Sequence, residues 1–335
     1  MADNTLIPRV LVEANIPYID PLAQVAHIER IAPEEFTSAT VRDADAIVVR
    51  TRTRCDAALL EGSRVKFVGT ATIGTDHIDL DWCRQAGITV ANAPGCNARA
   101  VAEYVFGCIA HLLPVPLSQY TIAVVGVGHV GRIVERWAKS LGMTVIPVDP
   151  PRQRAEGGAH WRTLAEAAAE ADIITFHTPL TRTGVDATFH LASEAFFQAL
   201  QRKPLVINAA RGPVADTEAW LCALRSGRCG AAVVDCWEGE PDINRRLLAA
   251  AAVATPHIAG YSRLGKMRAS QMVVDALTAC FALPPVDLFG QPLPDTPTHI
   301  IEADARAAYN PANDTAALRA DPTAFESLRN HYHLR

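Results

Sequence analysis

A glycine-rich turn at residues 126–131, Gly-Val-Gly-His-Val-Gly, constrains the fold of this chain more than any other feature. It follows the aliphatic run Thr121–Val125 and leads into a stretch of helical character, Val130–Leu141. Between a strand and a helix, the first glycine permits a tight bend, the second lets the backbone approach a pyrophosphate, and the third packs the helix on the strand. The motif predicts a dinucleotide-binding unit, with contacts from Gly126, Gly128, His129, Val130 and Gly131.

The next aliphatic run ends at Asp149, 23 residues after Gly126. An acidic residue at this point of a dinucleotide-binding unit bonds the 2′-hydroxyl of the adenosine ribose, and its charge repels a 2′-phosphate. We therefore expect NAD as the cofactor. Arg152 and Arg154 follow closely in the sequence and leave NADP as the alternative.

Short aliphatic runs alternate with helical stretches along most of the chain. The runs predicted as strands are Val10–Val12, Ala46–Val49, Val65–Val68, Thr121–Val125, Met143–Val148, Asp172–Phe176, Leu205–Asn208 and Ala231–Val234. This alternation is typical of parallel sheets covered by helices on both faces. A length of 335 residues allows about two domains. The predicted fold class is α/β, with two doubly wound parallel-sheet domains of the Rossmann and flavodoxin type.

Two long helical stretches, Ala98–Leu113 and Tyr261–Leu283, end at prolines and mark the predicted domain boundaries. We expect a first domain over residues 1–113 that receives a returning helix at about 261–283, a NAD-binding domain over 114–260, and a linker with a small C-terminal region over 284–335. Five prolines between Pro284 and Pro297 predict an extended linker. The closing stretch, Asp321–Arg335, is expected to be helical.

Three polar residues, Arg211, Glu240 and His257, follow three separate strands of the predicted second sheet. The carboxyl ends of parallel strands meet at one edge, where ligands bind, so the three side chains should reach one cleft. Their chemistry suits oxidation of a 2-hydroxy acid. An imidazole takes the hydroxyl proton, a carboxylate orients that imidazole, and a guanidinium fork binds the substrate carboxylate. Each residue alone could be an ordinary loop residue, but together they predict a catalytic site.

These motifs resemble the D-isomer-specific 2-hydroxyacid dehydrogenases. The matching segments are Gly126–Gly131, Phe176–Leu180, Asn208–Gly212, Asp235–Pro241 and Pro256–His257. The resemblance implies that Arg211, Glu240 and His257 are the catalytic residues. It further implies that Thr178, Ala209, Ala210, Asp235 and Gly260 line the NAD site.

A narrower resemblance is to the members of this family that act on a phosphorylated four-carbon acid. It is carried by residues 67–72, 74–77, 92–98, 101–106, 237–241, 256–262 and 265–266, and in the tail by Tyr309–Pro311 and Leu318–Arg319. It implies NAD-dependent oxidation of 4-phospho-D-erythronate to 2-oxo-3-hydroxy-4-phosphobutanoate in pyridoxal 5′-phosphate biosynthesis. It also implies a small C-terminal α+β region that forms a homodimer, and substrate contacts at Thr51, Thr72 and Tyr261.

The segment Arg50-Thr51-Arg52-Thr53-Arg54 places three cations and two hydroxyl groups just past a predicted strand. In a protein with a net charge of −5, such a local group of cations is suited to hold a phosphate. We therefore expect Arg50 and Arg52 to bind substrate as well. The alternative is a solvated basic loop.

Composition excludes several other classes of function. The net charge of −5 argues against a nucleic-acid partner, and no apolar run reaches the roughly 18–20 residues of a membrane span. Met1–Arg9 lacks the apolar segment of a signal peptide. The eight cysteines include no C-x-x-C pair and no adjoining histidine cluster at zinc spacing. We expect small buried thiols, no metal site and a cytoplasmic protein.

Two other functions stay open. One is a D-2-hydroxyacid dehydrogenase acting on another substrate, such as 3-phosphoglycerate. The other is a NADH-sensing binding protein similar to transcriptional corepressors that share this fold. Three departures from the family pattern stand out: a short link between Leu113 and Thr121, Ala210 in place of the usual cysteine, and a short tail after Tyr332. We expect the first to affect the hinge between domains and the last to affect the dimer contacts.

Overall fold

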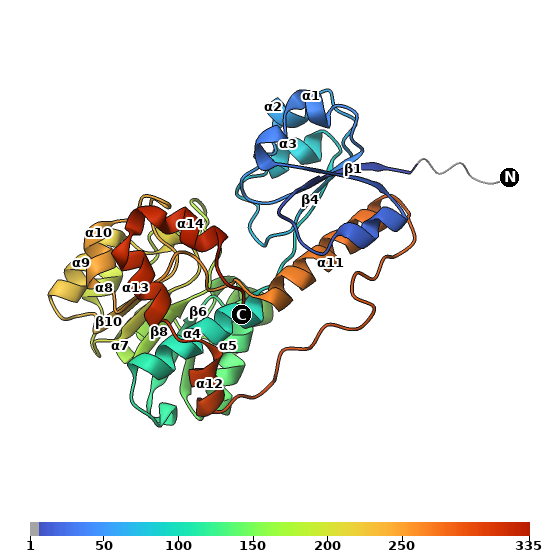
Figure 1. Ribbon diagram of the computed structural model, residues 1–335. Helices are drawn as coiled ribbons and strands as arrows, with labels where there is room; N and C mark the ends of the chain where they lie inside the picture. Colours follow the sequence, from blue (N-terminus) through green and yellow to red (C-terminus); the bar gives the residue numbers. More distant parts are fainter. Residues whose placement is uncertain (1–6) are drawn as a thin grey trace. The chain divides into compact units, whose positions relative to one another are not determined.

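A computed structural model describes residues 7–335, which form two compact units (Figure 1). The first unit comprises the described residues up to Asn97 together with Ser262–Asp295, and the second comprises Ala98–Tyr261 together with Thr296–Arg335. Residues 1–6 lie outside the described part of the chain. The predicted start of the first domain and most of the segment considered for a signal peptide fall on these residues.

A five-stranded parallel sheet with the order β2-β1-β3-β4-β5 forms the centre of the first unit. Its strands are β1 (Arg9–Glu13), β2 (His27–Ile31), β3 (Ala46–Val49), β4 (Phe67–Thr70) and β5 (Thr89–Ala91). Its helices are α1 (Ser38–Val41), α2 (Ala57–Leu60), α3 (Leu80–Gln85) and α11 (Arg263–Cys280), with 3-10 turns η1 (Asp20–Gln24) and η2 (Pro33–Glu35). Through Val273, Val274 and Leu277, α11 covers one face of this sheet.

The second unit contains a six-stranded parallel sheet with the order β11-β10-β9-β8-β6-β7. Its strands are β6 (Thr121–Val125), β7 (Thr144–Val148), β8 (Ile173–Phe176), β9 (Leu205–Asn208), β10 (Ala231–Val234) and β11 (Val253–Ala254). The chain runs outward from β6 to β7 and then returns to β8 on the other side of β6. Ligands of open α/β sheets bind at the carboxyl edge beside such a reversal of strand order.

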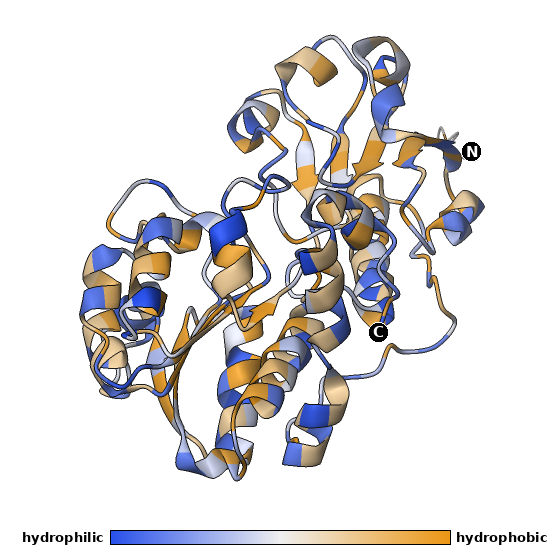
Figure 2. Ribbon diagram, turned by 60° about the vertical axis from the view of Figure 1, so that its left-hand side comes forward, coloured by the Kyte–Doolittle hydropathy of each residue, from blue (hydrophilic) through white to orange (hydrophobic). Residues whose placement is uncertain are grey.

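Helices cover both faces of the second sheet. They are α4 (Ala98–Leu112), α5 (His129–Ser140), α6 (Pro150–Glu156), α7 (Leu164–Glu170), α8 (Glu194–Gln198), α9 (Thr217–Arg225), α10 (Arg245–Ala250), α12 (Glu302–Ala308), α13 (Ala312–Ala320) and α14 (Phe325–Asn330), with 3-10 turns η3 (Leu117–Gln119), η4 (Gly212–Val214) and η5 (Pro322–Ala324). Alternate residues of β6 face two separate cores, one shared with α4 and α5 and the other with α7, α8 and α9. The strands are accordingly apolar along most of their length, whereas the helices combine apolar and polar residues (Figure 2). None of the helices in residues 7–335 combines the length and apolar character needed to cross a bilayer.

The aliphatic runs predicted as strands are all strands, and only β4 is displaced, by two residues. Strands β2 and β5 were not predicted. Both are edge strands. Strand β2 contains charged as well as apolar residues and is not fully buried, and β5 has only three residues. Neither strand therefore carries the continuous apolar run that marks a strand buried on both faces.

The division of the chain into units differs from the predicted boundary at residue 113. Helix α4 belongs to the second unit, because its apolar residues pack against α5 and α12. The first unit consequently ends at Asn97. The short link between Leu113 and Thr121 lies inside the second unit, so it is not the hinge between domains that we expected.

The C-terminal region was expected to be α+β, but the described residues after Asp295 contain helices and no strand. Its large apolar residues Tyr309, Leu318 and Phe325 are buried in the two cores of the second unit. The C-terminal region buries these side chains against the six-stranded sheet of the second unit, so it needs no sheet of its own. The proline-rich stretch from Pro284 to Pro297 contains neither helix nor strand, as predicted.

Candidate active site

The glycine turn joins β6 to α5, as the motif predicts. Gly126 has a φ of +87°, and a Cβ there would lie 2.8 Å from the carbonyl carbon of His177. At Gly131 a Cβ would lie 2.0 Å from the carbonyl oxygen of Gly126. Gly128 differs, because it is exposed at the N-terminus of α5 and a Cβ there would meet nothing within 4 Å. The turn thus packs tightly at two glycines and leaves space at the third, next to the positive end of a helix dipole.

Asp149 directly follows β7 and forms hydrogen bonds with the glycine turn and with α6. Its Oδ2 accepts a hydrogen bond from the Val127 amide at 2.8 Å, and its Oδ1 caps α6 by accepting from the Arg152 amide at 3.0 Å. The Arg152 guanidinium donates to the Val127 carbonyl and forms an ion pair with Glu156 at 2.8 Å. Both arginines that could favour NADP are therefore held by carboxylates, since Arg154 pairs with Asp186.

Two buried polar atoms at the end of β8 have no hydrogen-bond partner, namely His177 Nδ1 and Thr178 Oγ1. The other ring nitrogen of His177 lies 3.0 Å from Thr175 Oγ1, and burial lowers the pKa of His177 to about 3, so the ring is neutral. Buried polar groups without partners are rare in native proteins. Next to a helix N-terminus with open space at Gly128, they fit a bound dinucleotide, whose polar atoms would complete them.

The loops that carry Arg211 and Glu240 approach each other closely. Asn208 is buried at the end of β9, where its side chain bonds the Ala210 amide at 3.1 Å and the Arg211 carbonyl at 2.9 Å. A Cβ at Gly212 would lie 1.9 Å from the carbonyl oxygen of Trp237. Because β9, β10 and β11 are neighbouring parallel strands, the residues that follow them, including all three predicted catalytic residues, lie along one edge of the sheet.

His257 and Glu240 form a hydrogen-bonded pair. The distance from His257 Nδ1 to Glu240 Oε2 is 2.8 Å, while Glu240 Oε1 accepts from the Trp237 amide at 2.7 Å. Burial alone would lower the pKa of His257, but Cys236 and the Glu240 carboxylate raise it well above its usual value. Burial would conversely raise the pKa of Glu240, but His257 lowers it. His257 has a φ of +56°, an uncommon conformation that the surrounding hydrogen bonds maintain.

Asp235 anchors the loop that follows His257. The carboxylate is buried, and its oxygens accept hydrogen bonds from the Ile258 amide at 2.8 Å, the Ala259 amide at 3.0 Å and the Thr255 hydroxyl at 2.7 Å. Burial raises the pKa of Asp235. The contacts of Asp235 therefore fix the loop of residues 257–261, which is a role besides the predicted one in the NAD site.

Cys236 lies close enough to Glu240 and His257 for the three side chains to surround a metal ion. The Glu240 and His257 atoms, however, already bond each other at 2.8 Å, and Glu240 also accepts from the Trp237 amide. The Cys236 thiol lies 3.5 Å from the Ala210 carbonyl, and burial raises its pKa, which disfavours the thiolate that binds metals. We therefore describe the cluster as a hydrogen-bonded pair beside a buried thiol.

The other predicted substrate residues are in the first unit. Thr51 and Arg52 are exposed, Arg50 is partly buried, and its amide donates to Glu13 Oε2 at 2.8 Å. Thr53 donates to the same oxygen at 3.1 Å. Thr72 Oγ1 lies 2.7 Å from Thr70 Oγ1 and donates to the Gly74 carbonyl at 3.1 Å. Glu13 itself is fully buried, so one hidden carboxylate holds the basic loop in place.

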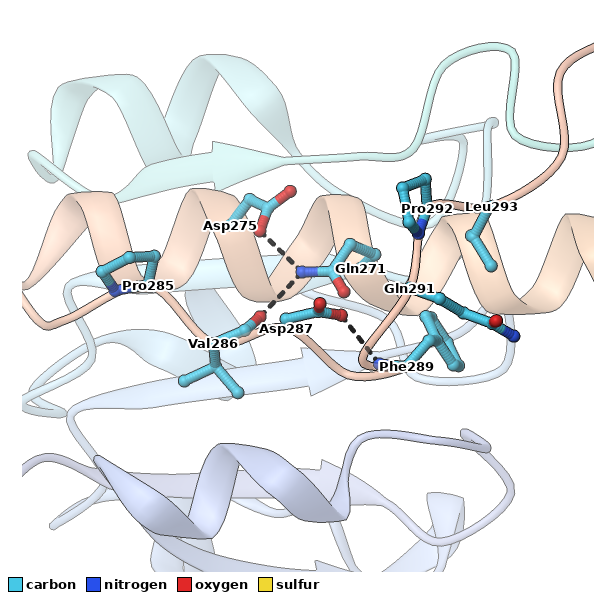
Figure 3. A pocket seen from close by; sticks show the side chains of 9 residues that line it. All are labelled: Gln271, Asp275, Pro285, Val286, Asp287, Phe289, Gln291, Pro292 and Leu293. Carbon is cyan, nitrogen blue, oxygen red and sulfur yellow. Dashed lines mark hydrogen bonds between the residues drawn. The ribbon is translucent and has the colours of Figure 1, made fainter.

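A surface pocket of about 340 Å³ lies elsewhere in the first unit, where the proline-rich linker crosses α11 (Figure 3). Gln271 connects the two segments, because its Nε2 donates to Asp275 Oδ1 and to the Val286 carbonyl, each at 2.8 Å, and its Oε1 accepts from the Leu288 amide at 2.9 Å. None of the predicted site residues lines this pocket. Its internal hydrogen bonds attach the linker to the helix.

Known proteins place the chain in a family. Residues 100–259 match the family model described as the NAD-binding domain of D-isomer-specific 2-hydroxyacid dehydrogenases. The erythronate-4-phosphate dehydrogenase of Bacteroides thetaiotaomicron is 45% identical, with 98% of this chain and 96% of that protein aligned. The enzyme of the same name from Escherichia coli O81 is 39% identical, with 97% and 90% aligned.

The chain belongs to the D-isomer-specific 2-hydroxyacid dehydrogenase family. This confirms the resemblance in its broad and its narrower form, and makes the chain an NAD-dependent dehydrogenase. Among solved structures, D-lactate dehydrogenase of Aquifex aeolicus in complex with NAD and lactic acid has a TM-score of 0.68 at 24% identity, covering 81% of this chain and 94% of that one. The TT0316 protein of Thermus thermophilus has a TM-score of 0.69 at 27% identity, covering 83% and 98%. Both confirm the α/β fold.

Three residues that were not predicted contact predicted site residues or the loops that carry them. Glu13 and Asn208 shape the loops that carry predicted site residues, and Arg329 donates to the Tyr261 hydroxyl at 3.2 Å. The first two have a signal in the sequence, because each is a polar residue that ends an aliphatic run. Arg329 has none, since only the folded chain brings it to Tyr261.

Proposed function

We propose that this dehydrogenase oxidises 4-phospho-D-erythronate to 2-oxo-3-hydroxy-4-phosphobutanoate with NAD, a step of pyridoxal 5′-phosphate biosynthesis. Relatives with 39–45% identity over nearly the whole chain carry the name of this activity. The observation that carries the proposal is the His257–Glu240 pair, next to the loop of Arg211 and at the same sheet edge as the glycine turn.

Each of the three residues has a distinct chemical role in the proposed reaction. Arg211 binds the substrate carboxylate, for which its planar fork of donors is suited. His257 Nδ1 is engaged by Glu240, so Nε2 is the ring nitrogen that takes the proton of the C2 hydroxyl. Glu240 orients the ring and stabilises its positive charge after the transfer. NAD, when bound, accepts the hydride that leaves C2.

The cofactor contacts follow the same edge of the second sheet. We propose that the pyrophosphate lies over the glycine turn, at the N-terminus of α5, and that Asp149 bonds the adenosine ribose. The full proposed set is Gly126, Gly128, His129, Val130, Gly131, Asp149, Thr178, Ala209, Ala210, Asp235 and Gly260. The ion pairs of Arg152 and Arg154 support NAD over NADP. Each of these two cations is already paired with a carboxylate, which would compete with a 2′-phosphate.

We propose that the basic loop recognises the phosphate. Arg50, Thr51 and Arg52 supply cations and a hydroxyl, and Thr72 supplies a further hydroxyl from the end of β4. Tyr261 is the remaining proposed substrate contact and lies in the second unit, four residues after His257. Buried Glu13 supports this assignment, since a carboxylate is hidden there to hold the loop backbone.

A parallel assay of substrates tests the proposed function. The purified full chain is supplied with NAD and, in separate reactions, 4-phosphoerythronate, 3-phosphoglycerate and D-lactate, and NADH formation is followed. The proposal requires that 4-phosphoerythronate has the highest kcat/KM. A preference for 3-phosphoglycerate would assign the chain to another substrate of the family, and NADH binding without turnover of any acid would indicate a NADH-sensing binding protein.

We further propose a homodimer and a cytoplasmic location. All eight cysteines are unpaired and six of them are buried, as suits a reducing compartment. Tyr309 and Leu318, which carry the resemblance to a dimerisation region, are buried within their own unit. A dimer would therefore use other residues of the tail, and the mass in solution by light scattering tests it. The net charge of −5 disfavours nucleic acid as a partner.

A further inference from the structure

The C-terminal segment Phe325–Arg335 lies against the loop of residues 257–261, which begins with His257 and belongs to the same unit. Phe325 anchors it, because this side chain is fully buried in the core that also contains β-strand residues of the second sheet. Beyond that anchor, Tyr332 packs edge-on against the Tyr261 ring with centroids 6.2 Å apart. Arg335 Nη2 donates to the Ala259 carbonyl at 2.6 Å, two residues after His257. The segment therefore touches the loop on both sides of Gly260.

Arg329 occupies the centre of this contact. It lies on α14, and only 19% of its side chain is exposed. Its Nε donates to the Tyr261 hydroxyl at 3.2 Å, and its Nη1 lies 3.6 Å from Glu326. The positive charge of Arg329 also contributes to the low pKa of Glu240, which burial alone would raise. A cation is thus held, largely away from solvent, beside the residues proposed to act on the substrate.

The chemistry of the Arg329–Tyr261 contact fixes the direction of the hydrogen bond. A guanidinium has donors only, so the Tyr261 oxygen must accept from Arg329. The hydroxyl hydrogen of Tyr261 is then directed to a different acceptor. A charged donor on the phenol oxygen also makes its hydrogen a stronger donor, because hydrogen bonds in a chain polarise one another. Such a hydroxyl is suited to an anionic oxygen of a phosphorylated hydroxy acid.

We propose that Arg329 is a positioning residue that fixes the Tyr261 hydroxyl as a hydrogen-bond donor to the substrate, and that the segment Phe325–Tyr332 is thereby a working part of the active site. This inference deepens the proposed function and rests on it for the class of substrate, a hydroxy acid. It does not depend on which acid the enzyme oxidises. The tail consequently has a role in substrate binding besides any role in assembly.

A double-mutant cycle on the full chain tests the inference. The variants are Arg329→Met, which keeps the length of the side chain without its donors, Tyr261→Phe, and the two combined. Each single variant should raise KM for the hydroxy acid by about 10- to 100-fold, the range for a lost hydrogen bond to a charged group, with KM for NAD unchanged. The combined variant should be no worse than Tyr261→Phe, since Arg329 acts through that hydroxyl.

Two further variants exclude a merely structural effect. Arg319→Met is the control, because this arginine of α13 donates to the Ala251 carbonyl before β11, and its loss should leave KM and kcat within about twofold of the wild type. Arg329→Lys keeps the charge and a donor, so it should restore part of the loss even if Arg329→Met folds poorly. Two results would overturn the inference. One is a fold-change in KM of the combined variant that equals the product of the two single fold-changes, and the other is an equal change in KM for NAD and for the acid.

The wild-type assay separates this inference from the proposed function. If the wild type prefers 3-phosphoglycerate or D-lactate to 4-phosphoerythronate, the substrate assignment fails. The cycle is then measured with the preferred acid. Non-additive effects there would still support the role of Arg329, whereas additive effects with any of the acids would contradict it.

Discussion

His257 Nδ1 and Glu240 Oε2 lie 2.8 Å apart, although the two residues follow different strands of the second sheet. Burial would lower the pKa of His257, but Cys236 and this carboxylate together raise it well above its usual value. This shift favours the imidazolium, which in the proposed reaction is the form that donates a proton during keto-acid reduction. In the proposed reaction, oxidation of the hydroxy acid needs the neutral ring and is favoured as the pH rises.

We predict opposite pH dependences for the two directions of the reaction. The kcat/KM for hydroxy-acid oxidation should rise with pH through an apparent pKa above 6.5, and that for keto-acid reduction should fall over the same range. In Glu240→Gln the pH at which oxidation gains activity should fall by about one pKa unit or more, because the carboxylate that bonds the ring no longer opposes the effect of burial. Glu238→Gln is the control. Its carboxylate bonds His190 at 2.7 Å instead, so this pH should not change. An unchanged pH dependence in Glu240→Gln would show that another group titrates.

Two replacements of Arg211 should distinguish the contribution of its positive charge from that of its planar arrangement of donors. Arg211→Lys keeps the charge but loses the planar fork, so we expect kcat/KM for the acid to fall by about 10- to 100-fold. Arg211→Ala should lose more, with KM raised and kcat lowered together. Steady-state kinetics and NADH fluorescence titration check this, and the Kd for NADH should stay within about threefold of the wild type. A large loss of NADH affinity would place Arg211 in the cofactor site instead.

Asp149 should determine the choice of cofactor. Asp149→Ser keeps an oxygen that can cap α6 at the Arg152 amide but removes the charge from the ribose site. We expect kcat/KM for NAD to fall by roughly 10- to 100-fold and that for NADP to rise, since the repulsion of a 2′-phosphate is relieved. The thermal unfolding midpoint serves as the control for the cap. Equal kcat/KM values for NAD and NADP in the unmodified protein would contradict the assignment.

Glu13 should support phosphate recognition, because its buried carboxylate bonds the loop that contains Arg50 and Arg52. Glu13→Ala removes the acceptor of the Arg50 amide and of the Thr53 hydroxyl. We expect the free energy of unfolding to fall by about 1–3 kcal/mol, as for buried donors left without a partner, and KM for the phosphorylated acid to rise. Glu13→Gln keeps one acceptor oxygen and should have the smaller effect in both urea unfolding and kinetics. A normal KM in Glu13→Ala would show that the loop is held by other contacts.

Much of this architecture could be predicted from local sequence patterns. Strands β3, β6, β9 and β10 are buried on both faces, and burial of that kind requires a continuous aliphatic run that is visible in the sequence. The tight turn likewise requires glycine wherever a Cβ would meet backbone, as at Gly131. Such constraints act on single residues and their neighbours, and a sequence shows them directly.

The features that sequence reasoning missed depend on contacts between distant segments. The tail was expected to form its own α+β region, because nothing local shows that Leu318 and Phe325 fill a core shared with the second sheet. Arg329 meets Tyr261 only after that docking, across 68 residues of sequence. The boundary at Asn97 depends in the same way on α4 packing against α12, which comes from the far end of the chain.

Recognition of the substrate phosphate is the central claim about specificity. The kcat/KM of the wild type is compared for 4-phosphoerythronate and unphosphorylated erythronate, and the comparison is repeated with an Arg50→Ala, Arg52→Ala double variant. Arg64→Ala, Arg84→Ala is the matched control, because it removes two cations of the same unit that pair with Asp45 and Asp81. We expect the phosphorylated acid to be preferred by about 10³-fold or more in the wild type and the control, since several charged hydrogen bonds depend on the phosphate. The double variant should lose most of this preference. Similar kcat/KM values for the two acids in the wild type would contradict the account.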